Sequence, residues 1–384
     1  MVERAGGLSR GHATWLLYGV FSSMAFLLNG MGAVLPPLQR ELHVTRGEVA
    51  FYPSLFAVGL VVVGLVGGPF VSRIGRGTAL RLAIAGLLLG ALLIAAPVHI
   101  ATLLGALLLG LGAALLIQLV PAILSAAQPQ APAAAIGEAN ALASATSVLA
   151  PLAVSASLAA GLGWRIGYLA APWLVLAALA VPAWRLVVPD GALPGPGATT
   201  GARSPMLGRW VDLVLAVSVE FCIVFWAASA FIAWDRATLS QAPALASLFL
   251  VGMATARALS ARIIAGIPHQ PALILACVAL ALAGFALFWA APTLTLAAAG
   301  LLITGLGVAL LYPTTVTRVI AAWPQAPDRA SARAALGSGL AIGIAPFLLA
   351  QASDRVGLRA AFLIVPALLL VLAVRGGRVY SAPR

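Results

Sequence analysis

The residue with the most evident chemistry is Glu220, an acid inside the long apolar run 210–234. A charged side chain at the centre of a lipid bilayer costs about 2.5–3.5 kcal/mol on insertion scales, so an acid is kept there only for a reason. We predict that Glu220 lies in a cavity, where it binds and releases a proton. The alternative is a neutral carboxyl group that hydrogen-bonds a neighbouring helix in the packed interior.

Four further side chains have polar or aromatic groups that suit a binding cavity. They are Asn29, Gln118, Trp226 and Tyr312. Solute sites combine apolar walls with a few placed polar groups, which is the mixture these residues would provide. The alternatives are interhelical hydrogen bonds for the two amides and a place at the membrane interface for Tyr312. Pro313 has no N–H, so it frees a backbone carbonyl and is expected to bend its helix.

Two oppositely charged residues stand at equivalent places near the starts of two apolar runs. Glu138 and Arg333 are 195 positions apart. We predict that they form a gate, paired in one state of the protein and separated in another. The alternative is two solvated charges at helix ends, because exposed ion pairs contribute little.

Several kinds of catalytic chemistry are excluded or disfavoured. All 22 basic residues are arginine. Without lysine there is no Walker A loop, no kinase-type ATP lysine and no Schiff base. The four histidines and two cysteines show no metal-ligand spacing. We therefore expect no enzyme, no catalytic residue, no metal and no cofactor; a membrane-embedded enzyme, which would need a nucleophile beside a base, is an alternative from a different class.

The composition shows which elements must position these residues. The 384 residues are 62% hydrophobic and 8% charged, whereas soluble chains are about 45–50% apolar and about 25% charged. A spanning helix needs about 20 apolar residues. Twelve runs meet this need: 13–38, 48–71, 78–97, 101–124, 138–161, 166–184, 210–234, 242–265, 271–290, 295–320, 332–352 and 358–374. The sequence predicts an all-α membrane protein with twelve transmembrane helices.

One polar break divides the twelve runs into six and six. Residues 186–209 are rich in Gly and Pro and are expected to form a linker. We predict five parts: a tail (1–12), a six-helix bundle (13–185), the linker (186–209), a second six-helix bundle (210–375) and a second tail (376–384).

Arginine positions predict the orientation. With the N-terminus inside, 16 arginines fall on the cytoplasmic side and six on the other side. Cytoplasmic loops carry the excess of basic residues. We expect a multi-pass protein of the inner membrane with both termini and the linker in the cytoplasm. The net charge of +12 thus reflects topology, and no nucleic-acid partner is expected.

The two halves repeat each other in sequence. Gly110-Leu111-Gly112 recurs 195 positions later as Gly305-Leu306-Gly307, and Ala150-Pro151 recurs at the same displacement as Ala345-Pro346. Because each half has an even number of spans, the two repeats have the same orientation in the membrane. Such parallel repeats place a central cavity between the halves.

One loop carries a recognisable signature between the second and third runs. The segment 68–77 reads G-P-F-V-S-R-I-G-R-G, and it resembles the G-x-x-x-D-R-x-G-R-R loop of the major facilitator superfamily. The matching residues are Gly68, Arg73, Gly75 and Arg76, while Ser72 stands in place of the acid. Because Ser72 carries no charge, we do not expect the acid's usual charge interactions in this loop.

The resemblance implies how the binding residues meet. Members of this superfamily line their cavity with the first, fourth, seventh and tenth helices, which would bring Asn29, Gln118, Glu220, Trp226 and Tyr312 together. Glu220 with Trp226 also resembles the E-x5-W pattern of fucose-permease-like sugar transporters. The arginine–glutamine motif of the drug-antiporter branch is absent: Ala106 and Leu109 stand where its arginine and glutamine would precede Gly110.

Together these features predict a secondary transporter that moves a small organic solute by alternating access, coupled to protons. The predicted partners are the bilayer, protons and a neutral or cationic solute, because no arginine cluster within the spans is expected to hold a multivalent anion. We expect a monomer. The alternatives are a drug or metabolite efflux antiporter and, from a different class, a membrane-embedded enzyme or a non-transporting sensor.

Overall fold

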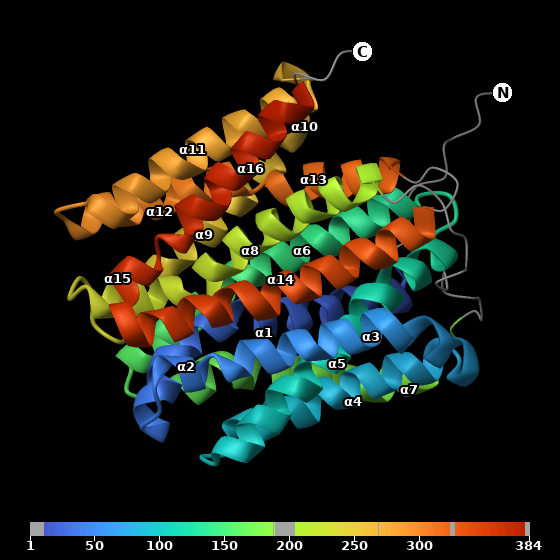
Figure 1. The fold of residues 1–384 in the computed structure, drawn as a ribbon. Helices are drawn as coiled ribbons and strands as arrows, with labels where there is room; N and C mark the ends of the chain where they lie inside the picture. Colours follow the sequence, from blue (N-terminus) through green and yellow to red (C-terminus); the bar gives the residue numbers. More distant parts are fainter. Residues whose placement is uncertain (1–10, 187, 189–203, 268, 323–326, 381–384) are drawn as a thin grey trace.

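The computed structural model describes residues 11–186, 188, 204–267, 269–322 and 327–380, and these residues form helices with no strand among them (Figure 1). The first half consists of α1 (His12–Leu42), α2 (Arg46–Val49), α3 (Phe51–Ile74), α4 (Arg76–Ala95), α5 (His99–Ala127), α6 (Pro132–Ala159), the π-helical turn η1 (Ile166–Ala170) and α7 (Ala171–Arg185). The predicted tail 1–12 and the linker 186–209 fall largely outside the described residues, whereas residues 376–380 of the predicted second tail continue the last helix.

The second half repeats this order with more interruptions. It consists of α8 (Ser204–Ala233), α9 (Gln241–Ala258), α10 (Ser260–Gly266), α11 (Gln270–Ala290), α12 (Leu294–Val308), α13 (Leu311–Ala321), α14 (Pro327–Val356), α15 (Leu358–Ala361) and α16 (Ile364–Tyr380). Among the described residues, eleven helices are long and apolar enough to span a membrane, or twelve if α9 and α10, bent by 63°, form one broken span. The predicted twelve-helix fold is confirmed.

The packing within each half confirms the repeat. In the first half α1 packs on α6, α3 on α5 and α4 on α5; in the second half α8 packs on α14, α9 on α12 and α11 on α12. The repeated glycines explain the shared geometry. A side chain at Gly110 would collide with the backbone of Phe56, and one at Gly305 would collide with the backbone of Phe249. Each glycine therefore lets two helices of its half approach closely.

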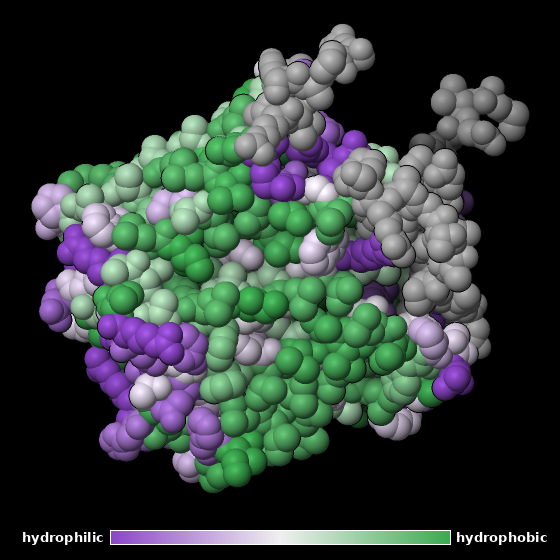
Figure 2. All heavy atoms as spheres, viewed as in Figure 1, coloured by the Kyte–Doolittle hydropathy of each residue, from purple (hydrophilic) through white to green (hydrophobic). Residues whose placement is uncertain are grey.

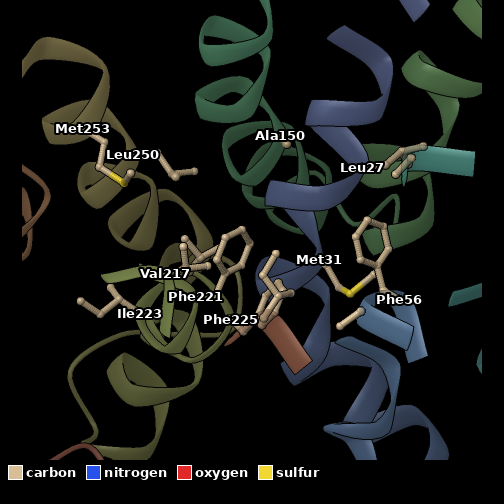
Figure 3. Close-up of a cluster of buried hydrophobic side chains, with 14 of the residues drawn as sticks. Leu27, Met31, Phe56, Ala150, Val217, Phe221, Ile223, Phe225, Leu250 and Met253 are labelled. Carbon is tan, nitrogen blue, oxygen red and sulfur yellow. The ribbon is translucent and has the colours of Figure 1, made fainter. Parts of the chain in front are cut away.

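The most extensive contacts between the halves are those of α3 with α14, α6 with α9, and α1 with α8. The linker side is defined by the first residues of α1 and α8 and the last residue of α7; the far side is the opposite end, where α2 and α15 lie (Figure 1). Apolar side chains fill the contact between the halves (Figure 3). There Phe221 and Phe225 of α8 pack with a centroid distance of 5.3 Å and lie next to α1.

The surface is suited to lipid. Figure 2 shows a broad hydrophobic face, with hydrophilic residues gathered toward the two ends of the molecule. Large apolar side chains such as Ile100, Leu174 and Trp184 are more than half exposed. In water such a surface would be an aggregation hazard, whereas in a bilayer it meets acyl chains at no cost. The chain is a multi-pass membrane protein.

Candidate functional site

A cavity of about 810 Å³ lies between the two halves. Its walls come from both halves, including Asn29 of α1, Gln118 of α5 and Glu220 of α8. The lining continues to Asn140 near the start of α6 and Gln270 at the start of α11. Both of these residues lie at the linker-side ends of their helices, so the cavity opens toward the linker side.

The far side, in contrast, is closed by hydrogen bonds between the halves. The backbone N–H of Gly47 donates to Asp354 Oδ2 at 2.7 Å, and Gln351 Nε2 donates to the carbonyl of Gly47 at 3.3 Å. The hydroxyl of Ser54 donates to the carbonyl of Gly343 at 3.2 Å. These bonds join the start of the first half's α2–α3 segment to α14, the helix that α3 packs against.

Glu220 meets an arginine in the cavity. Arg257 Nη2 lies 3.4 Å from Glu220 Oε1 and 3.5 Å from Oε2, and both residues line the cavity. The Glu220 side chain is 12% exposed, against 37% for Arg257. The carboxylate is thus mostly withdrawn from solvent, while the guanidinium faces the open volume. A negative and a positive charge share the site, and its formal charge is zero while the pair holds.

The position of Arg257 follows from two interruptions in the helices. Arg257 lies in the last turn of α9, just before the 63° bend into α10, and a cation is favoured at a helix C-terminus. Its Nε donates to the carbonyl of Ala309 at 3.3 Å. Ala309 lies four residues before Pro313, which has no N–H to donate, and the helix breaks between Val308 and Leu311. Pro313 is predicted to free a carbonyl and bend its helix; the structure shows the helix interrupted there, and Arg257 bonds the carbonyl of Ala309.

The two amides line the cavity and also join helices. Asn29 Nδ2 donates to Ser147 Oγ of α6 at 2.9 Å and to the carbonyl of Ala25 in its own helix at 3.1 Å. Gln118 Nε2 donates to the carbonyl of Val63 in α3 at 3.3 Å. Both sequence interpretations therefore apply to each amide, because its N–H group serves packing while the side chain still faces the cavity.

The two aromatic residues have different places. Tyr312 lines the cavity and is 37% exposed. Trp226 does not line it: the indole is fully buried, and its Nε1 donates to the carbonyl of Pro346 in α14 at 3.0 Å. The predicted grouping of Trp226 with the cavity residues is thus corrected. Six residues are about one and two-thirds helical turns, so Trp226 lies on a different face of α8 from Glu220.

The predicted gate residues lie on the linker side, each with contacts in its own half. The hydroxyl of Tyr18 in α1 donates to Glu138 Oε2 at 3.1 Å, and Trp210 Nε1 in α8 donates to the carbonyl of Arg333 at 2.8 Å. The cavity opens between the halves on this side. A gate formed by Glu138 and Arg333 remains a prediction about a state in which this side is closed.

The signature loop forms a tight turn between α3 and α4. Gly75 has φ +80° and ψ 152°, a conformation that favours glycine, and it alone separates Ile74 from Arg76. Ser72 is exposed, and its hydroxyl donates to the carbonyl of Pro69 in its own helix at 2.8 Å. The residue in the acid's place therefore caps its own helix turn, and Gly68 and Arg73 lie in the last two turns of α3.

Arg257 is the site residue that sequence reasoning missed. Arg257 is one of the 16 arginines that the orientation count places on the cytoplasmic side, although it lies eight positions inside the predicted apolar run 242–265. That position was the available signal. Within the described part of the chain, no group of three or more His, Cys, Asp or Glu residues could hold a metal ion.

Several solved structures with a similar fold are transporters. The chain resembles a bacterial homologue of the human lysosomal transporter Spinster in an inward-facing, occupied conformation: 15% identity, coverage of 97% of this chain and 98% of the other, and a TM-score of 0.74. The nucleoside transporter NupG is 13% identical; the match covers 96% of this chain and 100% of NupG, with a TM-score of 0.72. FucP in its outward conformation is 16% identical; the match covers 97% of this chain and 99% of FucP, with a TM-score of 0.60.

The sequence match agrees with these likenesses. No curated protein matches the sequence significantly. The family described as Major Facilitator Superfamily matches residues 15–326, which is well over half of the chain. With two repeated six-helix halves around a cavity open on one side, the chain belongs to the Major Facilitator Superfamily, and it is a transporter rather than an enzyme.

Proposed function

We propose that the protein is a proton-coupled secondary transporter that moves a small, largely apolar and neutral organic solute by alternating access. The observation that carries the proposal is the Glu220–Arg257 pair, which lies on the wall of a cavity open on the linker side. Secondary transport needs a group whose charge changes inside the solute cavity, and Glu220 is the carboxyl group that lines it.

The pair offers a mechanism for coupling. A proton on Glu220 removes the negative charge that Arg257 contacts, while Arg257 keeps its bond to the carbonyl of Ala309. Protonation thus weakens the contact between α8 and α9 without releasing Arg257 from α12 and α13. A ligand shifts a conformational equilibrium only through differential contacts in the two states, and this contact is such a difference.

The two sides of the molecule support alternating access. The cavity is open on the linker side, while the bonds of Gly47, Ser54 and Gln351 close the far side. Opening the far side requires these bonds to break as the halves rock. By the arginine bias the linker side is the cytoplasm, with both termini there and the protein in the inner membrane, so the structure corresponds to an inward-facing state.

The cavity charges refine the solute class. The sequence predicts a neutral or cationic solute, because no arginine cluster within the spans is expected to hold a multivalent anion. Arg257 lies at the cavity and neutralises Glu220, so it repels a cation and favours a neutral solute. Asn29, Gln118 and Tyr312 line the same volume, and their polar groups would orient one polar end of the solute. All these residues come from one chain, which is consistent with a monomer.

The experiment begins with a thermal-shift screen of the purified protein against neutral, cationic and anionic solutes. Hits are then assayed in proteoliposomes with an imposed pH gradient. The wild type is expected to accumulate a neutral hit when a gradient is present, and the direction of accumulation decides between uptake and efflux. Glu220→Gln is expected to lose gradient-driven accumulation at least tenfold while keeping exchange of solute for solute.

The matched control is Asp235→Asn, which removes an exposed acid outside the cavity. It is expected to transport like the wild type. Gradient-driven accumulation that persists unchanged in Glu220→Gln would contradict the coupling role. A protein that binds hits but never moves them would favour a sensor.

A further inference from the structure

A second pocket, of about 550 Å³, lies on the far side between the halves. Its first wall is the end of α1 and the turn into α2, with Arg40, His43 and Arg46; its second wall is the end of α8, with Ser229 and Ile232. None of its lining residues lines the central cavity. It is therefore a separate site, on the opposite side of the closed apolar contact.

The basic residues of this pocket are not neutralised by the acids around them. Among the described residues, the guanidinium groups of Arg40 and Arg46 make no hydrogen bond or ion pair. The neighbouring acids are engaged elsewhere: Glu41 with Arg165 Nη1 at 2.9 Å, and Glu48 with the backbone N–H of Thr45 at 2.7 Å. Asp235, two residues beyond α8, does not line the pocket.

The opposite wall carries an unsatisfied polar group. Ser229 is 5% exposed, and its Oγ has no hydrogen-bond partner in the described structure. Leaving a buried hydroxyl unpaired costs about 1–3 kcal/mol, so such groups in native proteins usually have a partner or a role. Ser229 belongs to the second half, whereas Arg40 and Arg46 belong to the first half.

We propose that this pocket binds a small oxyanion, such as phosphate or a phosphate ester, which Arg40 and Arg46 hold from the first half and Ser229 holds from the second. Guanidinium groups donate in a planar fork that matches phosphate and carboxylate oxygens, and a hydroxyl adds a further donor. His43 lies between the two arginines in the sequence, and it also lines the pocket on the same wall.

Binding here has a consequence for the transport cycle. The anion connects α1 to α8, which belong to different halves and separate when the far side opens. It therefore binds the far-closed state more tightly and shifts the population toward that state. An oxyanion bound on the far side therefore inhibits opening of that side, and this inhibition is independent of the solute and of Glu220.

The test is thermal unfolding of the full chain in detergent, with sodium phosphate against sodium chloride at matched ionic strength. Phosphate is expected to raise the midpoint of the wild type saturably, and chloride is not. The double variant Arg40→Gln/Arg46→Gln is expected to lose the response, and Ser229→Ala is expected to weaken phosphate binding about tenfold. Arg355→Gln, which removes an exposed far-side arginine outside the pocket, is expected to respond like the wild type.

A second arm separates free phosphate from a lipid headgroup. Micelles with and without phosphatidylglycerol are compared; stabilisation by either source that is lost in the double variant supports the site and identifies its ligand. An equal response of the wild type and the double variant, or no response of the wild type to either source, overturns it.

A third measurement does not depend on the pocket variants. Spin labels at Val98→Cys and Leu296→Cys report the far-side distance between the halves, since both residues are exposed and the native Cys222 and Cys277 are buried. The ligand identified above is expected to narrow the distance distribution toward the closed state. An unchanged distance distribution would contradict the inference that the anion favours the far-closed state.

Discussion

The two halves share one frame but differ where the chemistry lies. Gln118 in α5 and Pro313 in α13 occupy equivalent places in the repeat, 195 positions apart. In the first half α5 runs unbroken from His99 to Ala127. In the second half the helix breaks between Val308 and Leu311, and the carbonyl of Ala309 accepts a hydrogen bond from Arg257.

The charged pair shows the same asymmetry. The positions equivalent to Glu220 and Arg257 in the first half are Ala25 and Val62. The cavity wall of the first half therefore offers amides that also hold helices together, while that of the second half offers an ion pair at interrupted helices. The comparison teaches that the duplicated frame provides packing, and that a few changes in one copy provide a charge that can respond to protons.

The largest expected effect on stability comes from introducing into α5 of the first half a helix break like the one in the second half. Gln118→Pro removes a backbone N–H from the middle of α5 and is expected to destabilise the protein by about 3 kcal/mol. Gln118→Ala, the control, loses the side-chain bond to Val63 and is expected to cost about 1 kcal/mol. Thermal unfolding in detergent measures both. Equal losses would show that the continuity of α5 is not what distinguishes the halves.

Breaking the charged pair is expected to have the next largest effect. Arg257→Ala leaves the Glu220 carboxylate without its partner and is expected to cost about 1–3 kcal/mol, together with most of the transport. The double variant Arg257→Ala/Glu220→Gln is expected to regain much of the stability and none of the proton coupling. A double variant that is no more stable than Arg257→Ala would argue against coupling between the two side chains.

Substitution of Trp226 tests whether this residue lies outside the solute site, as the structure shows for the cavity lining. Trp226→Phe loses the bond to the carbonyl of Pro346 and is expected to destabilise the protein by about 1–2 kcal/mol without changing solute affinity. Tyr312→Phe, in the cavity wall, is expected to lower solute affinity while leaving stability unchanged. Titrations of a thermal-shift hit compare the two variants; a lower affinity in Trp226→Phe would return this residue to the site.

The smallest effect is expected from making the second half resemble the first. Pro313→Ala returns an N–H that can bond the carbonyl of Ala309, which is expected to add about 1 kcal/mol of stability. That bond competes with Arg257 Nε, so transport is expected to fall even as stability rises. Val316→Ala, in the same helix but outside the cavity lining, provides the control. Stability and transport that rise together would contradict the role of the freed carbonyl.

Most of the frame could be predicted because it depends on local patterns. The apolar runs, their bounds within a few residues and the repeat at 195 positions follow from hydropathy and from Gly and Pro placement. The site could be predicted only in part. Glu220 was identified as an acid in an apolar run, whereas Arg257 was assigned to a loop because nothing in the sequence shows that α9 ends early and bends by 63°.

Hydropathy and residue placement alone indicate that this protein spans a membrane, that it has two related halves and that Glu220 is its most unusual residue, because burial in lipid restricts which residues can stand in a span. Which charges meet depends on the packing of the helices. That packing brought Arg257 to Glu220 through the carbonyl freed by Pro313, it turned Trp226 away from the cavity, and it placed Ser229 opposite Arg40 and Arg46. Contacts between distant helices depend on how the halves pack against each other, and neither periodicity nor composition encodes that arrangement.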